Sequence, residues 1–367
     1  MSIEILNKGR RSTVYPLGGP QTTHTMKSIL ITGGAGFIGV NSAQHFASQG
    51  WRVTVVDNLS RRGTEDNLHW LQAQAPIAFE RADIRDAAAM ERIVAAVRPD
   101  VLLHLAAQVA VTTSVVNPRE DFDINALGTF NMLEAVRLHS PETFFITAST
   151  NKVYGKMHNV PVVERNGRYE YEHLTDGVSE DQPLDFHSPY GCSKGVADQY
   201  TLDYARIYGL RSTAFRQSCI YGTRQFGIED QGWVAWFTIA AVLGKPITIY
   251  GDGKQIRDVL HVKDLVRAYE AAAARPDQAS GQAFNIGGGP GNTMSLLELL
   301  AYLKDELRID IPLRWDDWRP GDQPVFVCNL TKARERLGWQ PQIGVREGVK
   351  DLAQWVSQNQ ALFAWLQ

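Results

Sequence analysis

The chain of 367 residues has only three cysteines and no long hydrophobic run. Cys192, Cys219 and Cys328 lie far apart, and none belongs to a CxxC pair. Such spacing argues against a disulfide framework and against a zinc site. No apolar segment approaches the ~20 residues that a membrane-spanning helix needs. We therefore expect a protein of a reduced, cytoplasmic compartment, with no membrane association and no metal ion.

A strong charge of either sign is also missing. The sequence holds 37 Lys and Arg residues against 40 Asp and Glu residues, for a net charge of −3. This balance provides no field that would attract nucleic acid or anionic lipid. Residues 1–25 show little periodicity and are expected to form a disordered leader. We find no internal repeat and no low-complexity segment.

The most informative stretch is a strand–turn–helix pattern that begins at Ile29. An apolar, β-branched run stops at a glycine turn, and a helical pattern follows. Gly33, Gly36 and Gly39 would permit a tight turn, close approach of a pyrophosphate, and packing of helix on strand. A helix N-terminus offers free N–H groups to an anion. The pattern predicts a dinucleotide-binding βαβ unit.

An acidic residue at the expected distance supports this prediction. Asp57 ends the next apolar strand, 18 residues after Gly39. A carboxylate at this place accepts hydrogen bonds from the adenosine ribose. Arg61 and Arg62 could instead accept an adenosine 2′-phosphate. Because Asp57 would repel that phosphate, NAD is favoured over NADP.

Strands and helices alternate from Met26 onward, which indicates a Rossmann-type, doubly wound parallel sheet of the α/β class. Ligands of such sheets lie at the carboxyl ends of the strands. Residues 155–187 are polar and lack clear periodicity, so we interpret them as a loop flanking the active site. The expected parts are an NAD-binding domain and a smaller, discontinuous α/β nucleotide-sugar-binding domain. The first comprises residues 26–222 and 256–290, and the second comprises residues 223–255 and 291–367.

The strongest catalytic signal is Tyr190-Gly-Cys-Ser-Lys194, which leads into a helix. A spacing of four places the tyrosine and the lysine on one helix face. A nearby ammonium favours the phenolate, so we expect a lowered pKa for Tyr190. A shift of about 3 units would be worth about 4 kcal/mol. Tyr190 could then act as a base on a substrate hydroxyl near neutral pH.

Several further motifs accompany the glycine turn and the Tyr–Lys pair. They are Asp57-Asn58, Asp83-Ile84, His104-Leu-Ala-Ala-Gln108, Ser149-Thr-Asn-Lys-Val-Tyr-Gly155, Arg257-Asp258 and Arg319-Pro-Gly-Asp322. With these motifs, roughly residues 26–355 resemble the extended short-chain dehydrogenase/reductase family of nucleotide-sugar epimerases and dehydratases.

The resemblance implies a role for each matching residue. Tyr190 would be the base, Lys194 would hold the nicotinamide ribose, and Thr150 would complete the triad in place of the commoner serine. The cofactor would also contact residues from four segments: Gly33, Gly36, Phe37, Ile38, Gly39, Asp57, Asn58, Ser60, Arg61, Asp83, Ile84, Leu105, Ala106, Ala107 and Gln108. The substrate would contact Ser114, Thr150, Asn151, Arg257, Arg319 and Asp322.

Two departures from the family pattern narrow the reaction. Dehydratases of the family carry an acidic residue directly after the Ser/Thr position, where this chain has Asn151-Lys152. Without that proton donor, epimerisation is favoured over loss of water. Cys219 replaces an asparagine that often touches the sugar, which suits a less hydroxylated sugar. The loop residues resemble a branch that epimerises C2 of a CDP-linked dideoxyhexose.

Alternatives from other classes remain open. The chain could be a UDP-hexose 4-epimerase, or an NAD-binding regulator without chemistry.

The resemblance also implies a homodimer or homotetramer, paired through helices near residues 128–138 and 197–208. Two polar residues are expected to be structural instead of catalytic: His104 as a hydrogen-bonded core histidine, and Asn125 as a support for neighbouring backbone.

Overall fold

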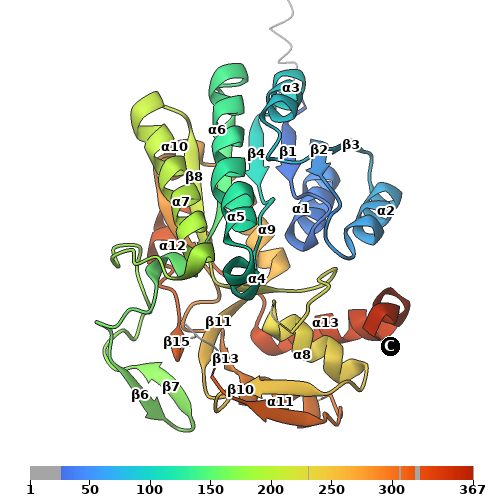
Figure 1. Ribbon diagram of the computed structural model, residues 1–367, viewed down its shortest axis with the longest axis vertical. Helices are drawn as coiled ribbons and strands as arrows, with labels where there is room; N and C mark the ends of the chain where they lie inside the picture. Colours follow the sequence, from blue (N-terminus) through green and yellow to red (C-terminus); the bar gives the residue numbers. More distant parts are fainter. Residues whose placement is uncertain (1–25, 230, 306, 319–322, 367) are drawn as a thin grey trace, which may run out of the picture.

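The computed structural model describes residues 26–229, 231–305, 307–318 and 323–366, and its largest element is a seven-stranded sheet (Figure 1). All of its strand pairs are parallel, as predicted for a doubly wound fold. Across the sheet the strands are β12 (Ala283–Ile286), β8 (Ser212–Gln217), β5 (Phe144–Thr150), β4 (Val101–His104), β1 (Ser28–Thr32), β2 (Arg52–Asp57) and β3 (Ile77–Arg81). The order reverses between β4 and β1, and such a switch point is where these sheets bind ligands.

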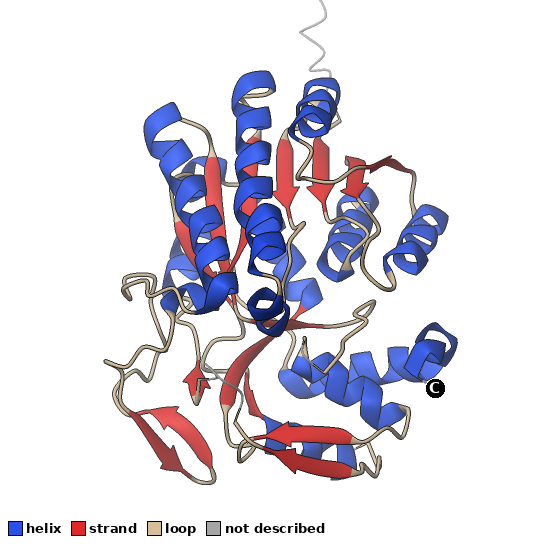
Figure 2. Ribbon diagram, viewed as in Figure 1, coloured by secondary structure: helices blue, strands red, loops and turns tan. Residues whose placement is uncertain are grey.

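Helices cover both faces of this sheet, as Figure 2 shows. Alternate residues of β1 point to opposite faces, so Ile29 and Ile31 enter one core and Leu30 enters the other. The first core also receives side chains from α1 (Phe37–Ser48), α9 (Val262–Ala273) and α12 (Thr331–Leu337). The second receives them from α3 (Ala87–Val97), α6 (Gly128–His139) and α7 (Ser188–Tyr208). Helices α2 (Thr64–Gln74) and α10 (Pro276–Ala279) pack beside α1 and α9.

The smaller lobe lies beyond the carboxyl ends of the main strands (Figure 1). Its central strand, β11 (Ile256–His261), pairs with three short strands: β9 (Cys219–Tyr221), β13 (Thr293–Ser295) and β15 (Val325–Phe326). A further parallel pair joins β10 (Ile247–Tyr250) to β14 (Leu313–Asp316). Strands β9 and β11 thus pair within the smaller lobe, although both lie in segments that we assigned to the NAD-binding domain. The domain boundaries stay a prediction.

One helix of this lobe lacks a clear signal in the sequence. Helix α8 (Trp233–Val242) is apolar on every side and therefore shows no helical alternation. With α11 (Leu296–Asp305), α13 (Val345–Gln358) and η3 (Gln360–Leu366), it builds the second large core. Four short helical segments lie in the connections that follow β4 and β5. After β4 come α4 (Val111–Val116), α5 (Pro118–Phe122) and η1 (Asp123–Leu127), and after β5 comes η2 (Asn151–Tyr154).

The expected loop at residues 155–187 contains an antiparallel hairpin, which corrects that prediction. Strands β6 (Val162–Arg165) and β7 (Arg168–Tyr171) are joined by Asn166 and Gly167, whose φ angles are +54° and +77°. Two consecutive positive φ angles are typical of the type I′ turn, and Asn-Gly is its preferred sequence. The hairpin therefore had a local signal that periodicity over the whole segment concealed.

Two properties of the described ranges bear on function. Every helix there is too short or too polar to traverse a bilayer. The same residues contain no group of three His, Cys, Asp or Glu side chains arranged to hold a metal ion.

Candidate active site

The glycine turn follows β1 directly and leads into α1. Gly33 has a φ of +65°, and a Cβ there would lie 2.7 Å from the Ala106 nitrogen of the loop after β4. A Cβ on Gly39 would lie only 2.2 Å from the Gly33 carbonyl oxygen. Both positions therefore require glycine. A side chain on Gly33 would push the turn away from the loop after β4, and one on Gly39 would push α1 away from the turn. The free N–H groups of the α1 N-terminus consequently face the end of the sheet, where an anion can bind.

Asp57 is buried at the end of β2 and is tied to this turn. Its Oδ2 accepts a hydrogen bond from the Ala35 nitrogen at 3.1 Å, and its Oδ1 accepts one from the Leu59 nitrogen at 2.8 Å. Burial nevertheless raises the pKa of Asp57 above its usual value. The carboxylate thus stands beside the glycine turn, as the sequence predicts, and its contact with a ribose stays a prediction.

A second acidic residue, Asp83, lies two residues after the end of the neighbouring strand β3. The amide of Asn58 donates to Asp83 at 2.8 Å, and the guanidinium of Arg85 pairs with the same carboxylate at 2.7 Å. The Arg85 hydrogen bonds hold the pKa of Asp83 at about 2, so the carboxylate stays charged. Asn58 and Asp83 therefore form one polar cluster at the outer edge of the predicted cofactor site.

The predicted catalytic residues meet the glycine turn in one cavity of about 290 Å³. Pro189 lies in the first turn of α7, where a missing N–H has no cost, and Tyr190 follows it. Lys194 lies one turn further on the same face, and Thr150 ends the adjacent strand β5. The cavity is lined by all three and by residues of the turn and its neighbours: Gly33, Gly36, Phe37, Ile38, Gly39, Arg61, Leu105 and Ala107.

The electrostatics of the pair differ from the prediction. Burial raises the pKa of Tyr190 to about 12, although a hydrogen bond from Thr150 and the charge of Arg61 act in the opposite direction. Burial lowers the pKa of Lys194 to about 8, and its ammonium donates to the Ala148 carbonyl oxygen at 2.5 Å. The expected lowering of the Tyr190 pKa is thus wrong for this environment, because desolvation outweighs the neighbouring charges.

The far wall of the cavity comes from the smaller lobe, which sequence reasoning mostly missed. Arg61 extends from the loop after β2 and donates a hydrogen bond to Gln231 of that wall. Cys219 lines the cavity, as its place in the motif suggested, and burial raises the pKa of its thiol. The other lining residues on this side are Ser218, Ile220, Gln225, Gln231, Gly232, Trp233 and Val234, while Gln217 lines the cavity from the end of β8 in the main sheet. Only their glycine-rich, tryptophan-containing context could have indicated them.

Three predicted substrate residues are buried near the cavity but do not line it. Ser114 of α4 is fully buried and donates to the Val111 carbonyl oxygen at 2.7 Å. Asn151 is buried at the start of η2, next to Thr150. Arg257 of β11 is buried and donates to the Ile256 carbonyl oxygen at 2.8 Å, and its charge lowers the pKa of Cys219. Their contacts with a substrate stay predictions, while Arg319 and Asp322 lie outside the described residues.

The remaining predicted cofactor residues support the site from outside its lining. Ala106 donates its backbone N–H to the Thr32 hydroxyl at 3.3 Å. Ser60 is exposed, and its nitrogen donates to Asn58 at 3.0 Å. Ile84 packs in the core against α3, and Gln108 turns its side chain to Ala110 and Asp121.

The two residues predicted to be structural are confirmed as such. His104 is buried between the hydroxyls of Thr32 (2.7 Å) and Thr129 (3.1 Å), and burial lowers its pKa to about 3. Asn125 accepts from the Gln108 nitrogen at 2.9 Å and donates to the Gln108 carbonyl oxygen at 3.0 Å. It therefore holds the loop that follows β4.

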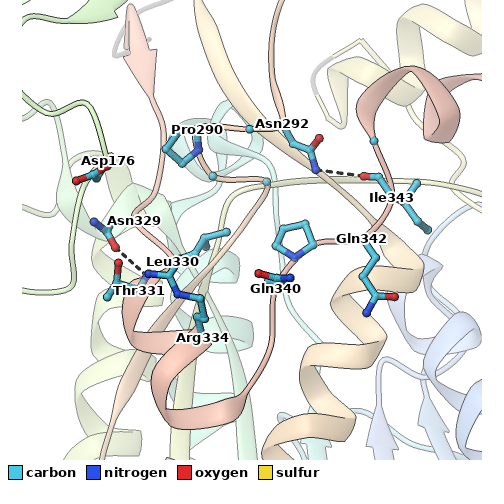
Figure 3. Close-up of a pocket in the computed structure, with 15 residues that line it drawn as sticks. Asp176, Pro290, Asn292, Asn329, Leu330, Thr331, Arg334, Gln340, Gln342 and Ile343 are labelled. Carbon is cyan, nitrogen blue, oxygen red and sulfur yellow. Dashed lines mark hydrogen bonds between the residues drawn. The ribbon is translucent and has the colours of Figure 1, made fainter.

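A second cavity, of about 510 Å³, lies between the loop after β12 and the start of α12 (Figure 3). Asn292 donates to the Ile343 carbonyl oxygen at 3.1 Å across it, and Arg334 is the one cation among the described residues that line it. Of the predicted site residues that the structure describes, none lines this cavity. The chemistry is therefore concentrated in the smaller cavity at the switch point.

Comparison with known proteins finds relatives that match most of the chain. The family described as GDP-mannose 4,6 dehydratase matches residues 30–352. CDP-paratose 2-epimerase of Salmonella typhi is 47% identical over 334 residues, which are 90% of this chain and 99% of the relative.

Solved structures resemble the whole fold. UDP-glucose 4-epimerase of Thermotoga maritima, solved with UDP-glucose, superposes with a TM-score of 0.79 at 33% identity and covers 91% of this chain and 99% of its own. dTDP-glucose 4,6-dehydratase of Streptomyces venezuelae, solved with NAD, superposes with a TM-score of 0.79 at 26% identity. The match covers 93% of this chain and 100% of the dehydratase chain. The chain therefore belongs to the extended short-chain dehydrogenase/reductase family of NAD-dependent nucleotide-sugar epimerases and dehydratases.

Proposed function

We propose that this chain is an NAD-dependent epimerase that converts CDP-paratose to CDP-tyvelose by inverting C2 of the sugar. One observation carries the proposal: a single cavity joins the glycine turn to Thr150, Tyr190 and Lys194. The 47% identical relative supports the choice of substrate, because the match extends over 99% of its length. Asn151-Lys152 supports epimerisation, because no carboxylate follows Thr150 to protonate a leaving hydroxyl.

The cavity suits NAD on three grounds. The close backbone approach at Gly33 and Gly39 leaves the α1 N-terminus open to a pyrophosphate. Asp57 would take the adenosine ribose, and Lys194 would take the nicotinamide ribose. Asp57 would also repel a 2′-phosphate, which favours NAD over NADP. When bound, NAD supplies a hydride acceptor and donor and a cationic ring.

The protein's own residues then handle the proton. In its phenolate form Tyr190 takes the proton of the C2 hydroxyl as C2 is oxidised, and the phenol returns that proton when the 2-keto sugar is reduced on its other face. Thr150 donates a hydrogen bond that favours the phenolate, and Arg61 adds positive charge nearby. Both interactions oppose the rise in the Tyr190 pKa that burial causes.

The experiment is a label-retention assay with CDP-paratose deuterated at C2. Retention of deuterium in CDP-tyvelose supports oxidation and return of the same hydride, whereas wash-out of the label contradicts it. Tyr190→Phe, which keeps the ring, is the matched control and should lack turnover.

A second candidate is a UDP-hexose 4-epimerase, which the likeness to the Thermotoga maritima enzyme favours. A panel of nucleotide sugars separates the two. Turnover of UDP-galactose without turnover of CDP-linked sugars would overturn our choice. Bound NAD without turnover of any nucleotide sugar would indicate a regulator instead.

We also propose that the protein forms a homodimer or a homotetramer through α6 and α7. The two helices lie side by side, and Phe130 and Tyr200 contact each other with ring centroids 6.0 Å apart. Several apolar side chains of these helices are at least 39% exposed, which is unusual unless a partner covers them. They are Phe130, Leu138, Tyr200, Ile207 and Tyr208. Light scattering tests this arrangement, and a monomer would contradict it.

A further inference from the structure

Residues 223–227, in the connection between β9 and α8, lie against two helices of the predicted cofactor site. We call this segment the strap. The side-chain amide of Asn41 in α1 donates to the Thr223 carbonyl oxygen at 3.0 Å. The side-chain amide of Asn67 in α2 donates to the Arg224 carbonyl oxygen at 3.2 Å. The strap therefore reaches from the helix of the glycine turn to the helix that follows the loop after β2.

Two side chains of the strap add contacts with α2. The Arg224 guanidinium lies 4.1 Å from the ring centroid of Trp70 in α2 and 5.8 Å from that of Trp355 in α13. A guanidinium within about 6 Å of an aromatic ring is attracted to its face. The Phe226 ring lies against Gly63, just before α2, where a Cβ would come within 2.3 Å of the ring.

The smaller lobe holds the strap from its other side. Phe226 packs against Trp355 of α13 and Phe363 of η3, with ring centroids 6.3 and 5.6 Å apart, and these rings belong to the second large core. Arg62 of the loop after β2 lies 4.2 Å from the ring centroid of Trp365 in η3. Helices α2 and α13 lie on the same side of the molecule (Figure 1). Separation of the lobes on this side requires these contacts to break.

The strap also forms part of the cavity wall. Gln225, between the two anchored side chains, lines the cavity together with Gly33, Gly36 and Gly39 of the glycine turn. Its Oε1 is buried and accepts no hydrogen bond from the described part of the chain. Buried carbonyl oxygens normally have a donor, and a ligand of the cavity could supply one. One wall of the predicted cofactor site is thus attached to both lobes.

We propose that the strap retains NAD in the cavity, with Arg224 and Phe226 as positioning residues that hold it against α2. Release of NAD then requires the strap to separate from α2, and segments that close over a ligand commonly control how fast it leaves. Retention suits a redox-neutral reaction, because the same cofactor must stay through both hydride transfers. The inference rests on NAD binding in the proposed function, but it does not depend on the identity of the sugar.

The test is the rate of NADH release from the full-length protein, measured without a sugar. Protein freed of cofactor is loaded with NADH, excess NAD displaces it, and stopped-flow fluorescence follows the loss of bound NADH. Arg224→Met keeps a long side chain but removes the charge. It should release NADH roughly 5- to 30-fold faster, the range that a partly buried cation–π contact supports. Arg224→Lys, which returns a cation to the Trp70 ring, should restore most of the retention.

A second variant tests the aromatic anchor. Phe226→Ala should release NADH roughly 5- to 150-fold faster, because two aromatic pairs are lost. Leu303→Ala is the matched control, because Leu303 is fully buried in the same core but lies in α11. It should lower the free energy of unfolding without changing NADH release.

The possible outcomes separate this inference from the proposed function. Release rates of Arg224→Met and Phe226→Ala within twofold of the parent would overturn the role of the strap and leave the epimerase proposal intact. Equal acceleration in Leu303→Ala would also overturn it, because loosening of the whole lobe would then explain the effect. A parent protein that binds no NADH would contradict both proposals. A failed epimerase assay leaves the result intact, because no step of the measurement needs a sugar.

Discussion

Replacement of Gly39 by alanine tests whether the glycine turn is the cofactor site. The new Cβ would lie 2.2 Å from the Gly33 carbonyl oxygen and 2.5 Å from the Gly34 Cα. Both neighbours are backbone atoms, so the clash cannot be relieved by a side-chain rotation. The turn must open by about 1 Å or more to restore an ordinary contact, and overpacking of this kind costs about 1–3 kcal/mol.

That cost is expected to fall on NAD binding, because a pyrophosphate requires the closed turn. A loss of 1–3 kcal/mol corresponds to roughly 5- to 150-fold weaker affinity. Isothermal titration of NAD into the protein freed of cofactor measures it directly. Gly291→Ala is the matched control, because a Cβ there meets no atom within 4 Å. NAD affinity of Gly39→Ala within twofold of the parent, in a folded protein, would refute the reasoning.

Three further predictions concern the catalytic helix and its support. Tyr190→Phe should lower kcat by roughly 10²- to 10⁴-fold while NAD stays bound, because only the proton-transfer group is lost; near-normal kcat would exclude Tyr190 as the base. The activity should fall as pH rises through about 8, where Lys194 loses the charge that holds the ribose, and a rate still flat at pH 9.5 would argue against that role. Arg216→Met should lower the free energy of unfolding by about 3–5 kcal/mol in urea titrations, because it leaves the buried Asp198 unpaired; a loss below 1 kcal/mol would show that the pair is dispensable.

Local signals in the sequence were sufficient for the sheet and for the centre of the site. The glycine spacing predicts the turn because only glycine allows the backbone of Gly39 to approach that of Gly33 and Gly34 so closely. The four-residue spacing predicts that Tyr190 and Lys194 share a face, because both lie in the first turns of one helix. These properties depend on neighbouring residues and can be derived without knowledge of the tertiary fold.

Properties that depend on distant parts of the chain were not predictable in the same way. The pKa of Tyr190 was expected to fall, but burial by segments remote in sequence raises it to about 12. The hydrogen bonds that Asp121 accepts from Gln108 and Ser193 were not predictable either, because these partners lie 13 and 72 residues away. Strands β9 and β11 pair within the smaller lobe although neighbouring segments belong to the main sheet. No sequence period distinguishes a strand of one sheet from a strand of the other.

The most direct test of the central claim is the fate of the C2 label during a single turnover. Our account holds that C2 of the sugar is oxidised and then reduced within one cavity, with Tyr190 carrying the proton. CDP-paratose deuterated at C2 should therefore yield CDP-tyvelose that keeps its deuterium, in ordinary water and without added NAD. Replacement of the deuterium by solvent hydrogen would contradict the account.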